Sequence, residues 1–244
     1  ALELPDEGYI GQQLATIPVD SVHAARNFLS REIALHNEAR FLRVYERLTS
    51  DAPYLYSAKE VGRRSFKATA LCFLTETGKA AHIREALDLL KRANNMTDEI
   101  SAIRSLIHHE GAEREEALHH FYQKWNKDSL VMNKWLALQG MSAIPGGLER
   151  IKRIIHDPVF SITNPNKVTS LLGAFGKNNP VQFHGIDGAA YRFYADLVMN
   201  IDGSNPSLAS RIVSLFNQWK RYDGVRQKLM RAELERIAGK DGIS

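Results

Sequence analysis

The residues with the most obvious potential for chemistry lie between positions 108 and 120, where four histidines and four glutamates are concentrated. A zinc peptidase of the His-Glu-x-x-His type carries two histidines one helical turn apart, with the intervening Glu as general base. Here the residue four positions after His109 is Glu113, so the motif is incomplete. The favoured interpretation is therefore a polar helix end with a solvated face, broken at Gly111. A helical metalloenzyme is kept as a subsidiary hypothesis, and its ligands would be His109, Glu113, Glu116 and His119.

Nucleophilic catalysis has no better support in the sequence. Cys72 lies in the apolar stretch Ala70–Leu74, which predicts a buried thiol with a raised pKa. The sequence contains neither a Gly-x-Ser-x-Gly elbow nor a glycine-rich phosphate loop. The sequence therefore predicts no catalytic residue and no metal or other cofactor bound by this chain.

Polar side chains suited to capping and binding gather in the last third of the chain. Asn164 and Asn166 lie in one Asn-rich loop, and Asn179 and His184 lie in a second. Such side chains usually cap helices or hydrogen-bond backbone groups. Arg211 follows the helix start at Asn205-Pro206 by two turns, and it is either a surface residue or one that points into a cavity.

Composition limits the class of protein. The chain has 244 residues, 44% hydrophobic and 25% charged, which excludes a disordered chain or a collagen-like repeat. No apolar run reaches the roughly 20 residues that span a bilayer, and residues 1–6 do not begin a signal peptide. A single cysteine excludes an internal disulfide. We therefore expect a cytoplasmic protein that does not bind a membrane.

The net charge of +4 arises in residues 211–236, which hold seven Lys/Arg and three Asp/Glu. Nucleic-acid-binding proteins often concentrate charge in this way. No exposed aromatic residues are interleaved with these basic residues, so we interpret them as the solvated face of helices and expect no nucleic-acid partner.

Apolar residues recur at helical spacing along nearly the whole chain. Asn205-Pro206 is expected to cap a helix whose apolar face runs from Leu208 to Trp219, and Asp98 or Thr97 to cap another. Residues 20–48 predict an unusually long helix that is kinked or split. Roughly eleven or twelve helices of about 10–16 residues, joined by short turns, predict an all-α fold of antiparallel helix pairs. The best match is an irregular HEAT/armadillo-like superhelix forming one domain over residues 1–244.

Several short motifs then carry a family resemblance. The chain resembles the C-terminal helical domain of bacterial aminopeptidase N, the zinc-dependent alanyl aminopeptidase family. The motifs, in order, are Asn94-Asn95-Met96-Thr97-Asp98, Leu130-Val131-Met132-Asn133-Lys134-Trp135, Asn164-Pro165-Asn166, Ser170-Leu171-Leu172-Gly173-Ala174-Phe175, Asn179-Pro180-x-x-Phe183-His184-x-x-Asp187-Gly188-x-x-Tyr191, Asn205-Pro206-x-x-Ala209-Ser210-Arg211 and Lys220-Arg221-Tyr222-Asp223.

The resemblance implies that zinc and its His-Glu-x-x-His motif belong to a preceding catalytic domain of the same polypeptide, so this chain alone should be inactive. It implies an α-helical superhelix that closes over that domain, encloses the active-site cavity and controls the entry of peptides with free N-termini. It also implies that Arg211 lines the substrate pocket. Ser207 stands where some relatives have a longer polar side chain. The loops that line the cavity would carry Asn164, Asn166, Asn179 and His184. The alternative function is a free-standing HEAT-like scaffold that binds protein or RNA through its basic end.

Overall fold

The computed structural model describes residues 4–244. Residues 1–3 lie outside the described residues. The predicted domain and the segment tested for a signal peptide both begin with these residues. The described part is helical and contains no strand, apart from one isolated parallel bridge between Ile17 and Tyr222. The predicted all-α class is therefore confirmed. The chain divides into two compact units, one formed mainly by residues 25–135 and the other by residues 5–24 and 136–244. That residues 1–244 form one domain stays a prediction.

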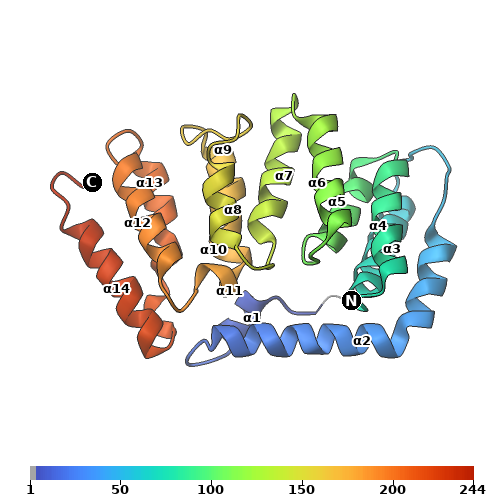
Figure 1. Cartoon of the computed structure of the whole chain (residues 1–244), viewed down its shortest axis with the longest axis horizontal. Helices are drawn as coiled ribbons and strands as arrows, with labels where there is room; N and C mark the ends of the chain where they lie inside the picture. The colour runs from blue at the N-terminus through green and yellow to red at the C-terminus, as the bar shows by residue number, and fades with distance from the viewer. Residues whose placement is uncertain (1–3) are drawn as a thin grey trace. The chain divides into compact units, whose positions relative to one another are not determined.

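The first unit is a set of antiparallel helices joined by short turns. Figure 1 shows α3, α4, α5 and α6 as neighbouring helices. Its helices are most of α2 (Val19–Leu48), α3 (Ala58–Glu76), α4 (Ala80–Arg92), α5 (Met96–Leu106), α6 (Ala112–Trp125) and the first half of α7 (Ser129–Met141). The core consists of the apolar faces of these helices, with Leu71, Leu90, Ile103 and Phe121 almost fully buried. Burial of such faces, more than helix propensity, stabilises helices of this length.

One expectation about this unit holds in part and another needs correction. The long helix predicted over residues 20–48 is present as α2, of 30 residues, and it is not split; Figure 1 shows its C-terminal part turning away from the direction of its first part. The N-cap of α5 is Asn95, whose side chain accepts a hydrogen bond from the Asp98 backbone N–H, so neither Thr97 nor Asp98 is the cap. Asp98 is buried within the first turn instead, where its carboxylate pairs with Lys67. The predicted break at Gly111 is confirmed, since this glycine has φ +144° and α6 begins directly after it.

The second unit alternates longer helices with short turns. Its elements are α1 (Glu7–Gln12), the start of α2, the end of α7, α8 (Gly147–Ile154), α9 (Pro165–Val168), the π-helical turn η1 (Thr169–Gly173), α10 (Ala174–Asn178), α11 (Pro180–Phe183), α12 (Ala189–Ile201), α13 (Pro206–Val213), the 3₁₀ turns η2 (Ser214–Phe216) and η3 (Trp219–Arg221), and α14 (Gly224–Ala238). The short elements explain why the described residues hold fourteen α-helices, of 4 to 30 residues, instead of the eleven or twelve expected.

An aromatic cluster forms the centre of the second unit. The Phe183 ring makes edge contacts with the rings of Phe175, Tyr191, Tyr194 and Phe216, at centroid distances of 5.0 to 6.2 Å. All five side chains are almost fully buried. Tyr194 donates its hydroxyl proton to the Leu172 carbonyl, which satisfies its polar end in the core. This cluster joins α10, α11, α12 and η2 into one packed core.

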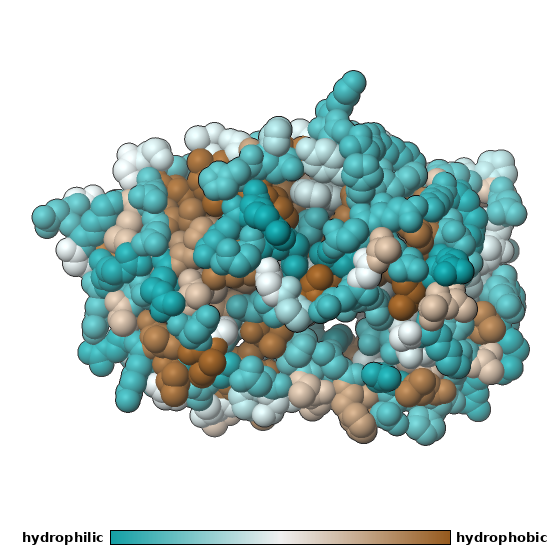
Figure 2. Space-filling model, in the orientation of Figure 1, coloured by the Kyte–Doolittle hydropathy of each residue, from teal (hydrophilic) through white to brown (hydrophobic). Residues whose placement is uncertain are grey.

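The predicted helix start at Asn205-Pro206 is confirmed. The Asn205 side chain accepts a hydrogen bond from the Leu208 N–H at 3.0 Å, and Pro206 occupies the first turn. The apolar face continues beyond this helix in a different conformation, because α13 ends at Val213 and a 3₁₀ turn carries Phe216 into the core. Figure 2 shows a visible face that is largely hydrophilic, with the larger hydrophobic areas toward the left, over the C-terminal helices.

Candidate functional site

Arg211 lies in the last turn of α13, on the rim of a cavity of about 250 Å³. We call this space the Arg211 cavity. Its walls are apolar, because the buried face of α13 contributes Leu208 and Ile212 and the opposite wall contains Val168 and Ala174. Arg211 lies beside the Leu208/Ile212 face of α13, so its side chain lies at the edge of this cavity. Whether it meets a substrate there stays a prediction.

The polar groups at the Arg211 cavity are few. Arg211 Nη1 donates a hydrogen bond to Thr169 Oγ1 at 3.4 Å, which links α13 to the π-helical turn η1. Among the described residues that line the cavity, Arg211 and Lys177 carry the positive charges and no acidic side chain is present. An apolar space with a guanidinium at its rim suits a ligand with an apolar body and a carbonyl or carboxylate end.

Thr169 and Lys177 were not singled out in the sequence. Their positions follow from the π-helical turn and from α10, which have no clear signal in residue spacing. Ser207, by contrast, was singled out. It is exposed in the first turn of α13 and is not among the residues that line this cavity.

The two asparagines of the first polar loop have different environments. Asn164 is the N-cap of α9, and its side-chain oxygen accepts hydrogen bonds from the backbone N–H groups of Asn166 and Lys167. Asn166 is exposed in the first turn of this short helix. A capping bond of this kind holds the loop in place and leaves the Asn166 side chain facing solvent.

Asn179 is buried and fixes the C-terminal end of α7. Its Nδ2 atom donates hydrogen bonds to the carbonyl oxygens of Gly140 at 3.1 Å and Ser142 at 2.8 Å. These carbonyls belong to the end of a helix, where the helix itself supplies no donors. The observed contacts of Asn179 are therefore structural, and nothing in them points toward a cavity.

His184 lies in a second cavity, of about 430 Å³, that we call the His184 cavity. Its walls come from α1, the start of α2, α10, α11 and the segment from η2 to Tyr222. His184 Nδ1 is 2.8 Å from the hydroxyl oxygen of Tyr191, and the imidazole is buried. Burial, assisted by the nearby positive charge of Arg226, lowers the pKa of His184 to about 3. The imidazole is thus neutral near pH 7.

The site residues predicted from sequence therefore do not converge on one place. Arg211 and His184 line different cavities, although Lys177 and Leu215 contribute to both. Ser207, Asn164, Asn166 and Asn179 line neither of the two cavities.

The histidine and glutamate stretch does not assemble a site. Residues 4–244 contain no group of three or more His, Cys, Asp or Glu side chains placed to hold a metal ion. His109 lies in the turn after α5, where burial lowers its pKa. Glu116, on α6, forms an ion pair with Lys91 at 2.6 Å. The subsidiary metalloenzyme hypothesis therefore has no geometric support among the described residues.

Three of the basic residues near the C-terminus, Arg226, Arg231 and Arg236, form ion pairs within the chain. Arg226 forms ion pairs with Asp20 and Asp223, both at 2.7 Å. Arg236 forms ion pairs with Asp196 and Glu233, at 2.6 Å each. Two of these acidic partners, Asp20 and Asp196, lie outside residues 211–236 and offset part of the positive charge of that segment. None of the helices formed by the described residues has both the length and the apolar character needed to cross a bilayer.

With this geometry described, comparison with known proteins gives the class of the chain. Residues 1–244 match the family described as "Domain of unknown function (DUF3458_C) ARM repeats", and the chain belongs to that family. The armadillo-like class predicted from the helical pattern agrees with this description.

Three curated relatives are similar to this chain over its whole length, and each is an aminopeptidase N. The identity is 33% for the proteins of Caulobacter vibrioides and Haemophilus influenzae and 30% for that of Escherichia coli. The chain spans 28% of each relative, and the matched region is the C-terminal part. The resemblance to this family is therefore confirmed.

A solved structure agrees with these relatives. The crystal structure of Legionella pneumophila aminopeptidase A in complex with aspartic acid superimposes with a TM-score of 0.88 at 26% identity. The alignment covers 97% of this chain and 29% of that one.

Proposed function

We propose that this chain is the non-catalytic C-terminal domain of a zinc aminopeptidase that removes N-terminal residues from peptides. In this proposal the domain encloses the active-site cavity of the catalytic part and controls which peptides enter. The observation that carries the proposal is the match of the whole chain to the C-terminal 28% of three aminopeptidase N proteins. The catalytic part would precede it on the same polypeptide, in the cytoplasm.

The zinc of such an enzyme would be held by the catalytic part. The sequence of this chain contains no His-Glu-x-x-His motif, and its own histidines and glutamates do not come together as a ligand set. When bound, zinc would polarise the peptide carbonyl and activate water. The residues of this chain would contribute by excluding bulk solvent and by orienting the peptide.

Arg211 is the residue through which the domain would touch substrate. Its guanidinium lies at the rim of an apolar cavity that has no acidic lining residue among those described. A guanidinium so placed would donate hydrogen bonds to a peptide carbonyl or carboxylate, while the apolar walls would receive a side chain. Ser207 is exposed and lies one helical turn before Arg211. In this proposal it would lie outside the Arg211 cavity, near its entrance. The Asn164, Asn166, Asn179 and His184 loops would form or support the wall further out.

Arg211→Ala in the full-length enzyme tests this role. A hydrogen bond to a charged group is worth about 1.5–3 kcal/mol, so KM for peptides should rise roughly tenfold or more while the zinc content stays the same. Arg211→Lys keeps the positive charge but lacks the planar guanidinium, so its KM should lie between those of the native enzyme and Arg211→Ala. Arg231→Ala, an exposed arginine on α14, is the matched control and should behave like the native enzyme. Unchanged KM for Arg211→Ala across several aminoacyl substrates would remove Arg211 from the pocket.

Control of entry is tested by the size of the substrate. The full-length enzyme should cleave the N-terminal residue from short, unfolded peptides and leave it on a folded protein with the same N-terminal sequence. An enclosed cavity admits a flexible chain and excludes a folded domain. Equal kcat/KM for both substrates would contradict the enclosing role even if Arg211 binds substrate.

The alternative scaffold function would use the basic C-terminal segment to bind RNA or protein. The internal pairing of Arg226 and Arg236 lowers the charge available for such binding. Nucleic-acid binding with a steep dependence on salt would support the scaffold instead.

A further inference from the structure

Three consecutive apolar side chains are exposed on the loop between α2 and α3. Tyr54, Leu55 and Tyr56 are 52%, 61% and 81% exposed. Single exposed apolar residues are ordinary, but two tyrosines and a leucine side by side form a contiguous patch of the kind that marks an interaction site. Residues 49–57 include one charged side chain, that of Asp51. Low charge and a high tyrosine content are typical of the core of an interface.

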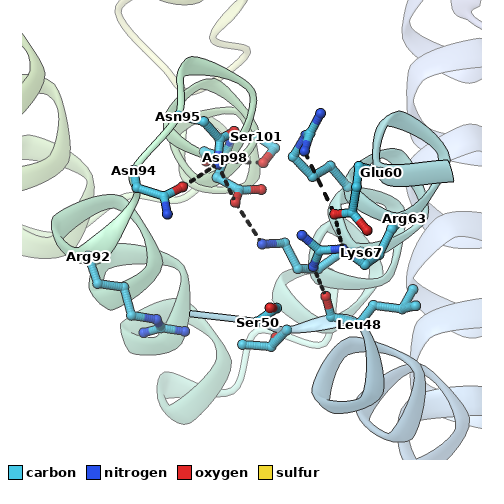
Figure 3. A network of polar contacts seen from close by, with 12 residues as sticks. Leu48, Ser50, Glu60, Arg63, Lys67, Arg92, Asn94, Asn95, Asp98 and Ser101 are labelled. Carbon is cyan, nitrogen blue, oxygen red and sulfur yellow. Dashed lines mark hydrogen bonds and ion pairs between the residues drawn. The ribbon is translucent and has the colours of Figure 1, made fainter. Parts of the chain in front are cut away.

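The loop that carries this patch is held from the side of α3. Arg64 is buried, donates a hydrogen bond to the Leu55 carbonyl at 3.2 Å, and places its guanidinium 4.7 Å from the centre of the Tyr54 ring. The preceding residue, Arg63, donates to the Leu48 carbonyl at the end of α2, as Figure 3 shows. Arg63 is itself fixed by Glu60, at 2.7 Å. Two arginines of one helix therefore fix the start and the tip of the loop.

A second support comes from the turn that precedes α5. Asn94 Nδ2 donates to the Ala52 carbonyl at 3.2 Å, and its Oδ1 accepts from Asn95. Asn95 also donates to Asp98, whose carboxylate pairs with the buried Lys67 at 2.8 Å. Figure 3 shows this chain of contacts from Asn94 to Lys67. The Asn94–Asp98 motif therefore connects the loop to two helices of the core.

The consequence is an exposed patch with a fixed backbone. Ordering a loop normally costs free energy when it binds, and a loop already held by Arg63, Arg64 and Asn94 avoids most of that cost. The side chains of Tyr54 and Tyr56 have two torsions each, so little further ordering is needed.

We propose that Tyr54, Leu55 and Tyr56 form a preorganised docking anchor for the preceding part of the same polypeptide. This inference rests on the proposed function, in which most of the enzyme lies outside this chain. The size of the patch favours a tethered partner. A stable complex between separate proteins buries about 800 Å² per partner, far more than three side chains supply. A segment of the same polypeptide is present at a high effective concentration, so a small patch is sufficient.

The test is the chemical reactivity of Tyr56 in the native full-length enzyme. Iodination followed by peptide mass spectrometry gives its rate, with the urea-denatured enzyme as the reference. Docking should slow the reaction by roughly an order of magnitude or more, because the reagent then reacts only when the contact opens. Reaction of Tyr56 at the denatured rate would overturn the proposal. Protection that disappears on dilution would also overturn it, because the occupant would then be a second copy.

Two variants show whether the patch itself makes the contact. Leu55→Ser removes an exposed apolar side chain and should raise the Tyr56 rate toward the denatured value. Leu130→Ser is the matched control, since Leu130 is 74% exposed in the same unit, and it should leave Tyr56 protected. Equal protection in both variants would show that the patch does not make the contact.

The docking anchor and the proposed function fail in distinguishable ways. An unprotected Tyr56 in an enzyme that still rejects folded proteins would remove the anchor and leave the enclosing role. A protected Tyr56 in an enzyme that accepts folded proteins would leave the docking anchor and remove the enclosing role.

Discussion

His184 is a buried imidazole whose pKa, near 6.5 in an unfolded chain, falls to about 3 in the fold because of burial and the charge of Arg226. The unfolded state therefore binds more protons between these two values, and stability decreases as the pH falls through this window. Between pH 7 and pH 5 the loss from this one group should be about 2 kcal/mol. Urea denaturation at the two pH values, followed by circular dichroism, measures it.

His184→Gln isolates this effect. The glutamine amide offers a hydrogen-bond acceptor to Tyr191 and does not titrate, so the variant should lose less stability than the native chain over the same pH range. The same pH dependence in both proteins would show that other groups cause it.

Lys67 is 2% exposed and pairs with the nearly buried carboxylate of Asp98. Lys67→Met should lower the free energy of unfolding by roughly 3–5 kcal/mol, because it leaves the Asp98 charge buried without a partner. Chemical denaturation measures the change.

Lys59→Met on the exposed face of the same helix is the control and should change stability by less than about 0.5 kcal/mol. A small effect at Lys67 would contradict the description of Asp98 and Lys67 as a buried ion pair.

The role of single residues was predictable where it depends on neighbours in sequence. Asn205 and Asn164 were expected to cap helices from the prolines that follow them, and both do. At the start of α5 the prediction was wrong by two or three residues, because Asn95, Thr97 and Asp98 lie close together in sequence and each could cap; Asp98 pairs with Lys67 instead. The buried partners of Asn179 and His184 come from segments 7 to 39 residues away, so spacing could not show them.

At the scale of elements, close helix packing depends on Gly140 near the end of α7. A Cβ atom there would meet the Leu171 carbonyl oxygen at 2.6 Å and the Phe175 nitrogen at 3.0 Å. Both are backbone atoms of the π-helical turn and α10, which cannot move without shifting those elements. Gly140→Ala should therefore destabilise the chain by about 1–3 kcal/mol, as thermal or urea denaturation would show.

Gly62, inside α3, is the matched control. A Cβ atom there has no neighbour within 4 Å, so Gly62→Ala should stabilise the chain by roughly 0.5–1 kcal/mol through the better helix propensity of alanine. Stabilisation by both substitutions would contradict the close packing described for Gly140.

The elements themselves were predictable in type and less so in extent. The period of apolar residues gave the helices but also suggested a break in α2, which is continuous over 30 residues. It also suggested one helix from Pro206 to Trp219, where the structure changes to a 3₁₀ turn at Ser214. A 3₁₀ turn keeps apolar residues on nearly the same face, so periodicity hardly separates the two.

At the scale of the whole molecule, the all-α class followed from the helical pattern, and the family followed from motifs spread over residues 94–223. The candidate site was less predictable. Arg211 reaches a cavity because η1 and α10 form the opposite wall, and that juxtaposition is a result of tertiary packing. The enclosing role came from the family resemblance alone, since no spacing in this chain encodes an active site.

The most direct measurement is aminopeptidase activity against alanyl-p-nitroanilide, with the metal content determined on the same samples of this chain and of the full-length enzyme. The account predicts zinc and turnover for the full-length enzyme, and neither for this chain. Turnover by this chain together with stoichiometric bound zinc would contradict the account, because the chemistry would then lie within residues 1–244.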